Sequence, residues 1–372
     1  MLGVLELPGR GSGFLRRREA SYLPSNGDVH VGERLIRQFG LRAGDEISGT
    51  VRPGGKGKGP SLDTVATILG QPAETLRERP EFARLGAVHP NERLRLEADG
   101  AVQGQADYTN RVIDLLCPLG KGQRALIVAP AKAGKTMVLQ SIAQGVSLNY
   151  PGADLFILLV DERPEEVFEM EAAGVGEVIA SSFDNPPQRH VALAELTLER
   201  ARRRVELGED VVLIVDSLTR LARAYNTVEK GSGRTLSGGL DAQSLEKPKR
   251  FLGSARRIDP AQGGGSLTII ATALVDTGSR MDQVIFEEFK GTGNSELVLS
   301  RELAERRVYP AIDLVASATR REELLLDPEA LAASHVLRQR IGGMTPINAM
   351  NDLLTDMRRN KTNSDLIRTL AA

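Results

Sequence analysis

Runs of apolar residues recur through the middle of the chain, and stretches with helical spacing lie between them. Ala153–Val160 is almost continuously apolar, which is typical of a strand covered on both faces of a parallel sheet. The longest helix is predicted at Gln188–Leu207. This alternation predicts a doubly wound α/β domain with a mainly parallel sheet. The other strands are predicted at Ala125–Val128, Glu177–Ser181, Asp210–Val215 and Ser266–Val275.

The first 70 residues follow a different pattern, in which short strand-like runs alternate with turn residues such as Ser25–Asp28 and Pro53–Gly55. One or two helical turns are predicted at Val31–Phe39. Five short strands at this spacing predict a small barrel of the oligonucleotide-binding (OB) or cold-shock type. The five runs are Gly3–Leu7, Gly13–Arg16, Val29–Val31, Glu46–Val51 and Asp63–Leu69.

These patterns divide the chain into a barrel at 1–70, a linker at 71–91 and an α/β domain at 92–372. The linker is rich in proline and carries a short charged helix, predicted at Ala73–Arg79. From Pro328 onward the α/β domain is predicted to end in amphipathic helices.

Composition limits the class of protein only loosely. The net charge is −1, but residues 1–60 hold ten Arg and Lys against six Asp and Glu, a local charge of +4. The single cysteine, Cys117, excludes an intramolecular disulfide and a cysteine metal cluster. With no apolar run of membrane-spanning length, the expectation is a soluble cytoplasmic protein without a membrane partner.

Ala129–Thr136 reads Ala-Pro-Ala-Lys-Ala-Gly-Lys-Thr and lies between a predicted strand and a predicted helix. In that context the segment is expected to be a phosphate-binding loop, because unpaired N–H groups at a helix start attract an anion. Lys135 would reach the β- and γ-phosphates of a nucleotide, and the Thr136 hydroxyl would bind Mg²⁺. Ala129 departs from the strict pattern, which opens with glycine.

Acidic residues follow three of the predicted strands, at Asp161–Glu162, Asp216 and Asp276. Ligands bind at the carboxyl ends of strands in open α/β sheets, so Asp216 is a candidate magnesium ligand. Glu162 is a candidate for polarising an attacking water. The alternative is that these acids cap the helices that follow them.

Arginines and glycine-rich loops add candidates in the second half. An arginine from a neighbouring subunit often completes a phosphoryl-transfer site, although most surface arginines are simply solvated or paired. The loops Lys230–Gly239 and Asp276–Asp282 carry Arg234 and Arg280; they are either ordinary surface loops or contacts to a polyanion backbone. The candidate arginines are Arg301, Arg306, Arg307, Arg320 and Arg321.

Five segments together resemble the transcription termination factor Rho family, bacterial hexameric RNA-dependent ATPases and translocases with a RecA-like domain. The resemblance covers nearly the whole chain and is far more specific than a phosphate loop alone. The segments are Ala129–Thr136, Asp161–Val167, Asp216–Asn226, Thr268–Gly278 and Glu287–Asn294.

The resemblance implies roles for individual positions. Glu162 would activate water, Lys135 would hold phosphates, and Arg320 would be the arginine finger of the neighbouring subunit. Thr136 and Asp216 would serve the metal, and Tyr309 would stack on adenine. The implied nucleotide-binding residues are Ala129, Pro130, Ala131, Lys132, Ala133, Gly134, Lys135, Thr136, Met137, Arg163, Asp216, Arg307 and Tyr309. The implied RNA-binding residues are Phe14, Arg16, His30, Lys58, Arg234, Thr235, Leu236, Ser237, Gly238, Gly239, Arg280 and Lys290.

Departures from the family pattern gather in the barrel. The family's N-terminal helical subdomain is not found before Leu2: either the start is late, the chain is truncated, or this relative lacks the subdomain. Within the barrel, Ser12 stands where the family has an aromatic ring, and His30 stands where a tyrosine is usual. A tyrosine expected near Lys58–Pro60 is also missing. Since base stacking is worth about 1–3 kcal/mol per base, the loss of two rings predicts that RNA loading is either weaker, by about tenfold or more, or changed in specificity. The alternative is that the Lys- and Arg-rich loop restores affinity through salt-sensitive phosphate contacts.

The sequence therefore predicts an ATP- and Mg²⁺-dependent RNA translocase or helicase. It would bind single-stranded RNA, assemble into a hexameric ring and dislodge RNA polymerase. One alternative is a ring ATPase of the same fold acting on a substrate other than nucleic acid, such as a rotary or protein-export motor. A second is a non-catalytic RNA-binding module that uses nucleotide only to hold its ring together.

Overall fold

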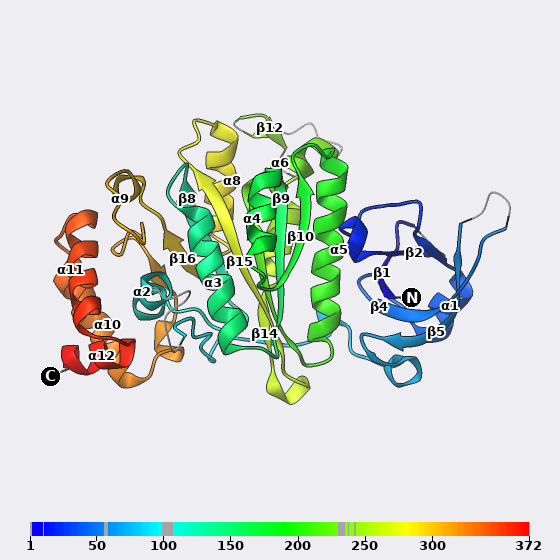
Figure 1. Ribbon diagram of the computed structural model, residues 1–372, viewed down its shortest axis with the longest axis horizontal. Helices are drawn as coiled ribbons and strands as arrows, with labels where there is room; N and C mark the ends of the chain where they lie inside the picture. Colours follow the sequence, from blue (N-terminus) through cyan, green and yellow to red (C-terminus); the bar gives the residue numbers. More distant parts are fainter. Residues whose placement is uncertain are drawn as a thin grey trace.

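The computed structural model describes residues 2–9, 11–55, 59–98, 107–229, 235–236, 238–241 and 243–371. A small β-barrel lies at one end of the molecule, a large sheet flanked by helices forms the middle, and the C-terminal helices lie at the opposite end (Figure 1). The N-terminal part and the C-terminus are therefore separated by the full width of the α/β domain.

The barrel is a six-stranded sheet in the order β3-β2-β1-β4-β5-β6, closed by a pairing between β3 and β5. The predicted five-stranded barrel is thus confirmed, and β6 extends it. Its core contains Leu5, Leu15, Ile47 and Ile68, each fully buried. The bounds are β1 Leu2–Glu6, β2 Gly13–Arg16, β3 Val29–Val31, α1 Glu33–Phe39, β4 Glu46–Arg52, β5 Ser61–Ile68 and β6 Gln71–Pro72, with a 3₁₀ turn η1 at Arg18–Ala20.

The central sheet has the strand order β10-β9-β11-β15-β8-β16-β17, and neighbours from β10 to β16 are parallel. This arrangement confirms the predicted doubly wound α/β domain. The bounds are β7 Ala87–Val88, β8 Arg124–Pro130, β9 Asp154–Glu162, β10 Glu177–Ser182, β11 Asp210–Asp216, β14 Arg256–Ile258, β15 Ser266–Val275, β16 Ser295–Val298 and β17 Ala318–Thr319; a separate hairpin pairs β12 Thr235–Leu236 with β13 Leu240–Asp241.

Helices cover both faces of the central sheet, and each face has its own apolar core. Helices α2, α3 and α10–α12 contribute to the core on one face, and α5–α8 to the core on the other. The bounds are α2 Tyr108–Leu116, α3 Lys135–Asn149, α4 Pro164–Ala172, α5 Pro187–Val205, α6 Leu218–Val228, α7 Glu246–Gly253, α8 Arg280–Lys290, α9 Arg301–Glu305, α10 Pro328–Ile341, α11 Pro346–Arg359 and α12 Asn363–Ala371, with 3₁₀ turns η4 Pro260–Gln262 and η5 Glu322–Leu324. Within the described residues, no helix is long and apolar enough to cross a bilayer.

The segment between the barrel and the sheet takes part in both. Strand β6 pairs with β5 of the barrel, and β7 pairs with β14 of the central sheet. The helix predicted at Ala73–Arg79 is wrong in length: only the 3₁₀ turn η2 (Ala73–Leu76) forms, and a second one, η3 (Phe82–Arg84), follows. The buried Arg79 side chain instead pairs with the buried carboxylate of Asp45, at 2.5 Å.

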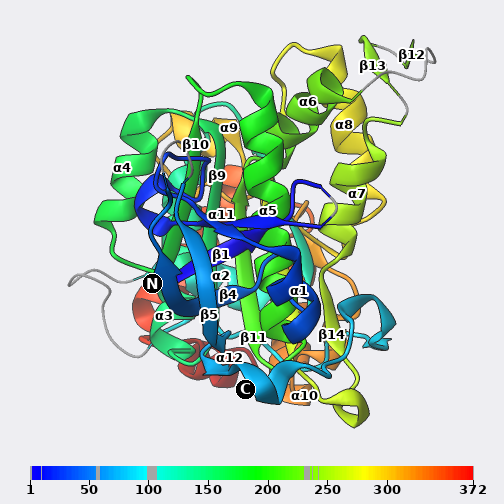
Figure 2. The ribbon, with the colours of Figure 1, turned by 90° about the vertical axis from the view of Figure 1, so that its right-hand side faces the viewer.

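A cluster of charged side chains joins the barrel to helix α5, which lies between the barrel and the central strands (Figures 1 and 2). The Arg200 guanidinium contacts Glu46 of the barrel at 2.6 Å and Glu177 of β10 at 2.8 Å. It also donates to the Tyr22 hydroxyl at 3.1 Å. Because removing one partner leaves a buried charge uncompensated, these contacts hold the barrel against the α/β domain.

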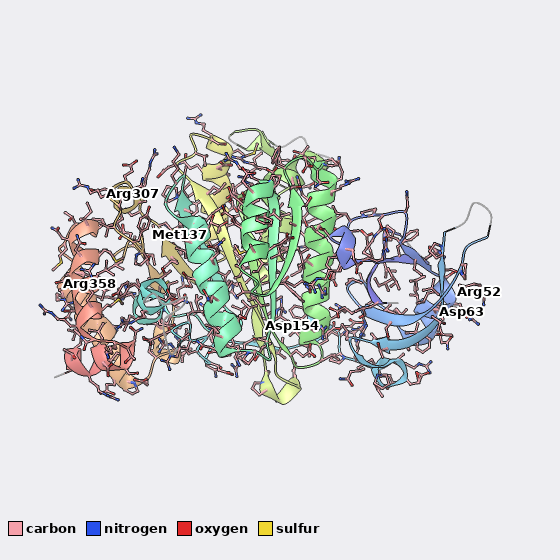
Figure 3. The ribbon with its side chains drawn as sticks, in the orientation of Figure 1. Arg52, Asp63, Met137, Asp154, Arg307 and Arg358 are labelled. Carbon is pink, nitrogen blue, oxygen red and sulfur yellow. The ribbon has the colours of Figure 1, made fainter. Side chains whose placement is uncertain are left out.

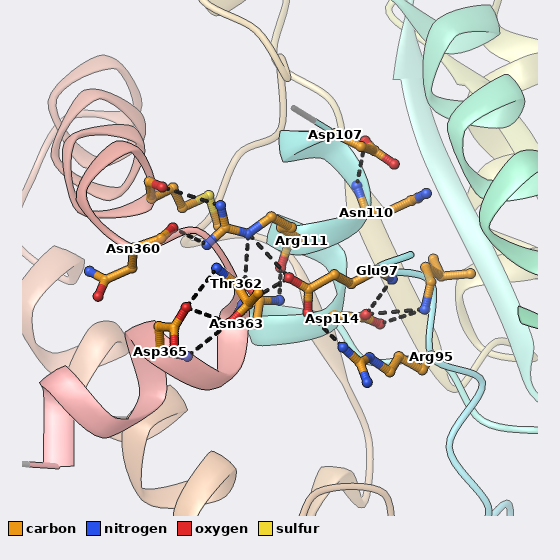
Figure 4. Close-up of polar contacts among 12 residues, drawn as sticks. Arg95, Glu97, Asp107, Asn110, Arg111, Asp114, Asn360, Thr362, Asn363 and Asp365 are labelled. Carbon is orange, nitrogen blue, oxygen red and sulfur yellow. Dashed lines mark hydrogen bonds and ion pairs between the residues drawn. The ribbon is translucent and has the colours of Figure 1, made fainter. Parts of the chain in front are cut away.

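A second polar cluster ties helix α2 to the C-terminal helices (Figure 4). Arg111 of α2 donates to the Asn363 amide oxygen at 3.1 Å and to the Asn360 carbonyl at 3.0 Å. Asp114, buried on the same helix, accepts from the backbone N–H groups of Leu96 and Glu97 at 3.0 and 2.8 Å. Burial raises the pKa of Asp114 to about 6, against the opposing effect of Arg93.

Candidate nucleotide and RNA sites

The predicted phosphate-binding loop lies between β8 and α3. Gly134 takes a left-handed conformation, φ 84°, just before Lys135 begins the helix, and no side chain caps that helix start. The first N–H groups of α3 are therefore available to an anion. Ala129 lies within β8, paired with Leu274, at ordinary strand geometry. Glycine is not needed there, which explains the departure from the strict pattern.

Lys135, Glu162 and Asp216 meet at the carboxyl edge of the sheet. The Lys135 ammonium lies 2.9 Å from Glu162 Oε1 and 2.7 Å from Asp216 Oδ1. Glu162 ends β9 and Asp216 ends the neighbouring β11, so the strand order brings the two acids together. The sequence-predicted residues thus form one charged cluster.

Burial and charge pairing compete within this cluster. Burial raises the pKa of both carboxyl groups, and the Lys135 ammonium opposes that rise without cancelling it. Burial alone would lower the pKa of Lys135, but Asp216 and Glu162 outweigh it and the net shift is upward. Lys135 therefore stays charged at neutral pH, ready to exchange the two carboxylates for phosphate oxygens.

The helices that follow Asp216 and Asp276 are capped by serine residues rather than by these acids. Helix α6 is capped by the Ser217 hydroxyl, which accepts from the Arg220 N–H at 3.2 Å. Helix α8 is capped by Ser279. Asp216 instead accepts from the Thr272 hydroxyl at 2.7 Å. The capping alternative is therefore wrong for Asp216 and Asp276.

The cluster also offers oxygen atoms suited to a hard divalent cation. Carboxylate oxygens of Glu162, Glu166 and Asp216 lie within 4.8 Å of one another. Among the described residues, the buried Glu162 Oε2 has no hydrogen-bond partner. Because Mg²⁺ prefers oxygen ligands, the residues present fit such an ion.

Two residues that contact the acidic side chains, Arg220 and Thr272, were not predicted from the sequence. Arg220 lies 3.5 Å from Glu162 Oε2 and also donates to the carbonyl of Asp161. Thr272, in the middle of β15, holds Asp216. The signal for Arg220 was present in the sequence: it follows Asp216 by four residues, one turn into the helix that leaves the strand end.

Beside the phosphate loop, a groove of about 580 Å³ is lined by Met137, Tyr309, Gln140, Gln144 and other residues. The Tyr309 ring lies close to the loop, since a methyl group at Gly134 would be 3.6 Å from it. Met137 and Arg307 both lie toward this end of the sheet (Figure 3). Met137, predicted to bind nucleotide, and Tyr309, predicted to stack on adenine, thus share one groove.

The five candidate arginines fall into two groups. Arg301, Arg306 and Arg321 are each paired with a nearby glutamate on the surface. Arg307 and Arg320 are exposed, and within the described part of the chain neither has a carboxylate within 4 Å. These two guanidinium groups are therefore the ones available to a phosphate. Arg163 precedes α4 and is exposed, as is Lys132 in the loop.

The two glycine-rich loops come together at the start of α8. A methyl group at Gly238 would lie 2.7 Å from the Met281 nitrogen, so the loop bearing Gly238 and Gly239 packs on the start of α8. Arg280 begins that helix and lines a pocket of about 470 Å³. Lys290 lies at the other end of α8. Thr235 and Leu236 form β12, whereas Lys58, Arg234 and Ser237 lie outside the described residues.

On the barrel, Phe14 and His30 face each other across β2 and β3 with ring centroids 5.7 Å apart. Arg16 stacks on Phe14 at 5.2 Å but is buried, and it pairs with Glu6 and with Asp28, at 2.5 Å. The Phe14 ring borders a pocket of about 350 Å³, which Arg16 also lines. Arg16 is therefore already neutralised within the barrel.

Two family models match the chain, one over the barrel and one over the central sheet. Residues 1–74 match the Rho termination factor RNA-binding domain, and residues 109–319 match the nucleotide-binding domain of the ATP synthase alpha/beta family. Taken with the phosphate loop and its acids, the chain is an RNA-binding P-loop ATPase.

Curated relatives show which family of RNA-binding ATPases the chain resembles. The chain is 51% identical over 370 residues to transcription termination factor Rho of Haemophilus influenzae, covering 99% of this chain and 87% of that one. Rho of Escherichia coli K12 matches with the same identity and coverage. Rho of Gemmatimonas aurantiaca is 54% identical over 97% of this chain, which spans 49% of that relative. The chain belongs to the transcription termination factor Rho family.

Solved structures with the same fold include ATPases of type III secretion systems. One prototypical ATPase from pathogenic bacteria superposes with a TM-score of 0.59 at 24% identity, over 76% of this chain and 85% of that chain. The assembled ATPase EscN, in complex with its central stalk EscO, gives a TM-score of 0.56 at 27% identity, over 71% and 60%. These likenesses support the α/β ATPase fold.

Proposed function

We propose that this protein is an ATP-driven RNA translocase that binds nascent single-stranded RNA and terminates transcription by RNA polymerase. The observation that carries the proposal is the union, in one chain, of the Lys135–Glu162–Asp216 cluster with a Rho-type RNA-binding barrel. The RNA-binding match favours this function over a protein-export motor of the same fold. The protein would act in the cytoplasm, where nascent RNA is made.

The proposed working form is a hexameric ring with ATP between subunits. Arg320 is exposed and free of carboxylate partners among the described residues, as a residue acting on a neighbour's nucleotide must be. The loops around Gly238 and Arg280 pack on each other and would grip RNA in the central channel.

The chemistry follows from the cluster. Bound Mg²⁺ supplies positive charge to the β- and γ-phosphates, and Thr136, Asp216 and Glu166 are the residues that would hold it. Lys135 leaves its carboxylate partners for the phosphates, and Glu162 orients water for in-line attack. Arg320 of the next subunit meets the charge that develops on the γ-phosphate, a contribution of about 10³–10⁵ in rate.

The test is steady-state ATP hydrolysis with and without single-stranded RNA homopolymers, at two salt concentrations. We expect RNA to stimulate hydrolysis, and Lys135→Ala to abolish it, while the matched control Lys361→Ala at the exposed C-terminal end remains active. Release of transcripts from stalled RNA polymerase should follow the same pattern. Fast hydrolysis indifferent to every RNA would overturn the proposal and favour a motor with another substrate.

A further inference from the structure

The short strand β17 ends one residue before Arg320, and its backbone is held in place on two sides. On one side, the Arg320 N–H donates to the carbonyl oxygen of Asn294 at 2.9 Å. Asn294 directly precedes β16, which pairs with β17 through Ser295 and Thr319. The position of the Arg320 backbone therefore depends on where Asn294 lies.

Asn294 is itself tied to the start of β8, the strand that ends in the phosphate loop. Its amide oxygen accepts from Gln123 Nε2 at 2.8 Å and from the Arg124 N–H at 2.9 Å. The same Gln123 nitrogen also donates to the Asn294 carbonyl at 3.1 Å. Gln123 is only 1% exposed, so these contacts are shielded from water. Asn294 thus links Arg320 to a central strand.

Thr319 holds β17 from the other side. Its hydroxyl donates to the Pro118 carbonyl at 2.8 Å and lies 3.0 Å from the Ser295 hydroxyl. The Thr319 side chain is buried, next to Cys117. Because a buried hydroxyl that loses its partner costs free energy, this contact fixes the residue before Arg320.

The Arg320 side chain, in contrast, is unrestrained by any carboxylate in the described part of the chain and is exposed. The nearby Arg124 guanidinium is anchored to the carbonyls of Thr292, at 2.9 Å, and Ala255, at 3.3 Å. Burial lowers the pKa of Arg124, and the charge of Arg320 lowers it further. This like charge disfavours folding of the Arg320 guanidinium back onto its own subunit.

We propose that Asn294 and Thr319 are positioning residues for Arg320, holding its backbone so that the guanidinium meets the γ-phosphate bound in the neighbouring subunit. Neither residue touches the nucleotide in its own chain, and both act through Arg320. The inference rests on the proposed function, in which Arg320 acts between subunits.

Steady-state kinetics with saturating RNA supply the first test. Misplacement of a reacting group by about 1 Å can cost about 10²-fold, so Asn294→Ala should lower kcat by about 10- to 100-fold while KM for ATP changes by less than about twofold. Thr319→Val keeps the shape but loses the hydroxyl, and should lower kcat by about three- to tenfold. Thr319→Ser keeps the hydroxyl and should restore most of the rate. Thr355→Val removes an exposed hydroxyl in α11 that also donates to a backbone carbonyl; it is the control and should leave kcat unchanged.

Mixed rings separate positioning from general damage. Chains carrying Asn294→Ala keep an intact nucleotide site, whereas Glu162→Gln chains keep an intact Arg320. In a mixed ring, the nucleotide site of an Asn294→Ala chain can face the intact Arg320 of a Glu162→Gln chain. The rate of ATP hydrolysis should therefore exceed the sum of the rates measured for the two variants separately. Arg320→Ala mixed with Glu162→Gln is the reference and should behave in the same way. Damage to a chain's own nucleotide site cannot be rescued by this partner.

The outcomes distinguish this inference from the proposed function. Wild-type kcat in Arg320→Ala would overturn the role of Arg320 between subunits, and this inference with it. Loss of activity in Arg320→Ala together with near-normal kcat in Asn294→Ala and Thr319→Val would overturn the positioning role alone. The positioning role would also be overturned if Asn294→Ala and Thr319→Val lost activity that mixing with Glu162→Gln failed to restore.

Discussion

The nucleotide site and the barrel both place a cation beside two acids, yet the two cations have different uses. Lys135 begins α3 at the carboxyl edge of the sheet, and its carboxylate partners end strands β9 and β11. Arg16 is buried and is paired with both Glu6 and Asp28. A cation at the carboxyl edge of the sheet is available for chemistry, whereas one enclosed by its partners stabilises the fold.

This difference implies that RNA binding by the barrel depends on its aromatic rings rather than on the charge of Arg16. With Arg16 neutralised, the described barrel surface offers RNA the rings of Phe14 and His30. Stacking on rings tolerates salt better than phosphate contacts do. The barrel and the nucleotide site should therefore respond differently to substitution and to pH.

Removing the charge of Glu162 should have the largest effect. Glu162→Gln deprives the attacking water of its base, so kcat should fall by about 10²–10⁴-fold. ATP binding should persist because Lys135 and the start of α3 are unchanged in this variant. Steady-state hydrolysis and nucleotide titration measure the two properties. Glu171→Gln, on the exposed side of α4, is the control; comparable loss there, or full activity in Glu162→Gln, would contradict the assignment.

Removing the charge of Arg16 should act on stability instead. Arg16→Ala leaves Glu6 and Asp28 without their cation, and breaking a buried pair costs about 3–5 kcal/mol in the free energy of unfolding. Chemical denaturation followed by a barrel-specific probe measures this loss, with exposed Arg34→Ala as the control. A stable Arg16→Ala protein that simply binds RNA less well would show that Arg16 contacts RNA after all.

Asp114 is a buried carboxylate of a different kind, because its partners are mainly backbone N–H groups rather than cations (Figure 4). Its folded-state pKa, about 6, lies above the unfolded value of 3.8, so the folded protein binds the extra proton between these values. Stability contributed by the protonated group is present below about pH 4 and is lost as pH rises through 6. The loss amounts to about 3 kcal/mol.

Comparison of the wild type with Asp114→Asn isolates this contribution. The unfolding free energy of the wild type, relative to that of the variant, should decrease between pH 4 and pH 6 and then level off. Equilibrium denaturation across this range measures the difference. A difference that rises with pH would mean that Arg93 and the N–H groups lower the pKa of Asp114.

The smallest effect is expected at the barrel rings. Phe14→Ala removes one stacking surface and should weaken RNA binding by about 1–3 kcal/mol without changing ATP affinity. His30→Phe should change affinity in the opposite direction. Binding of short oligonucleotides to the barrel surface measures both, with exposed Leu148→Ala on α3 as the control. Unchanged binding in Phe14→Ala would assign RNA loading to other residues.

Much of the local structure follows from the sequence because its causes are local. Strands β2, β3 and β15 have the predicted bounds, since alternating or continuous apolar runs end at turn residues. The phosphate loop and the strand-end acids Glu162 and Asp216 were recognised for the same reason. Their meeting could be anticipated from the rule that parallel strands share an edge.

Tertiary structure decided what each charge does. Which elements pack together determines the ion-pair partner of each arginine. Arg16 pairs with Asp28, Arg79 pairs with Asp45 where a helix was predicted, and Arg220 lies near Glu162. The link from Gln123 through Asn294 to Arg320 joins segments about 200 residues apart, and sequence spacing carries no sign of it. Local patterns set where strands and loops begin, but the free energy of a buried charge depends on partners that only the folded chain brings within reach.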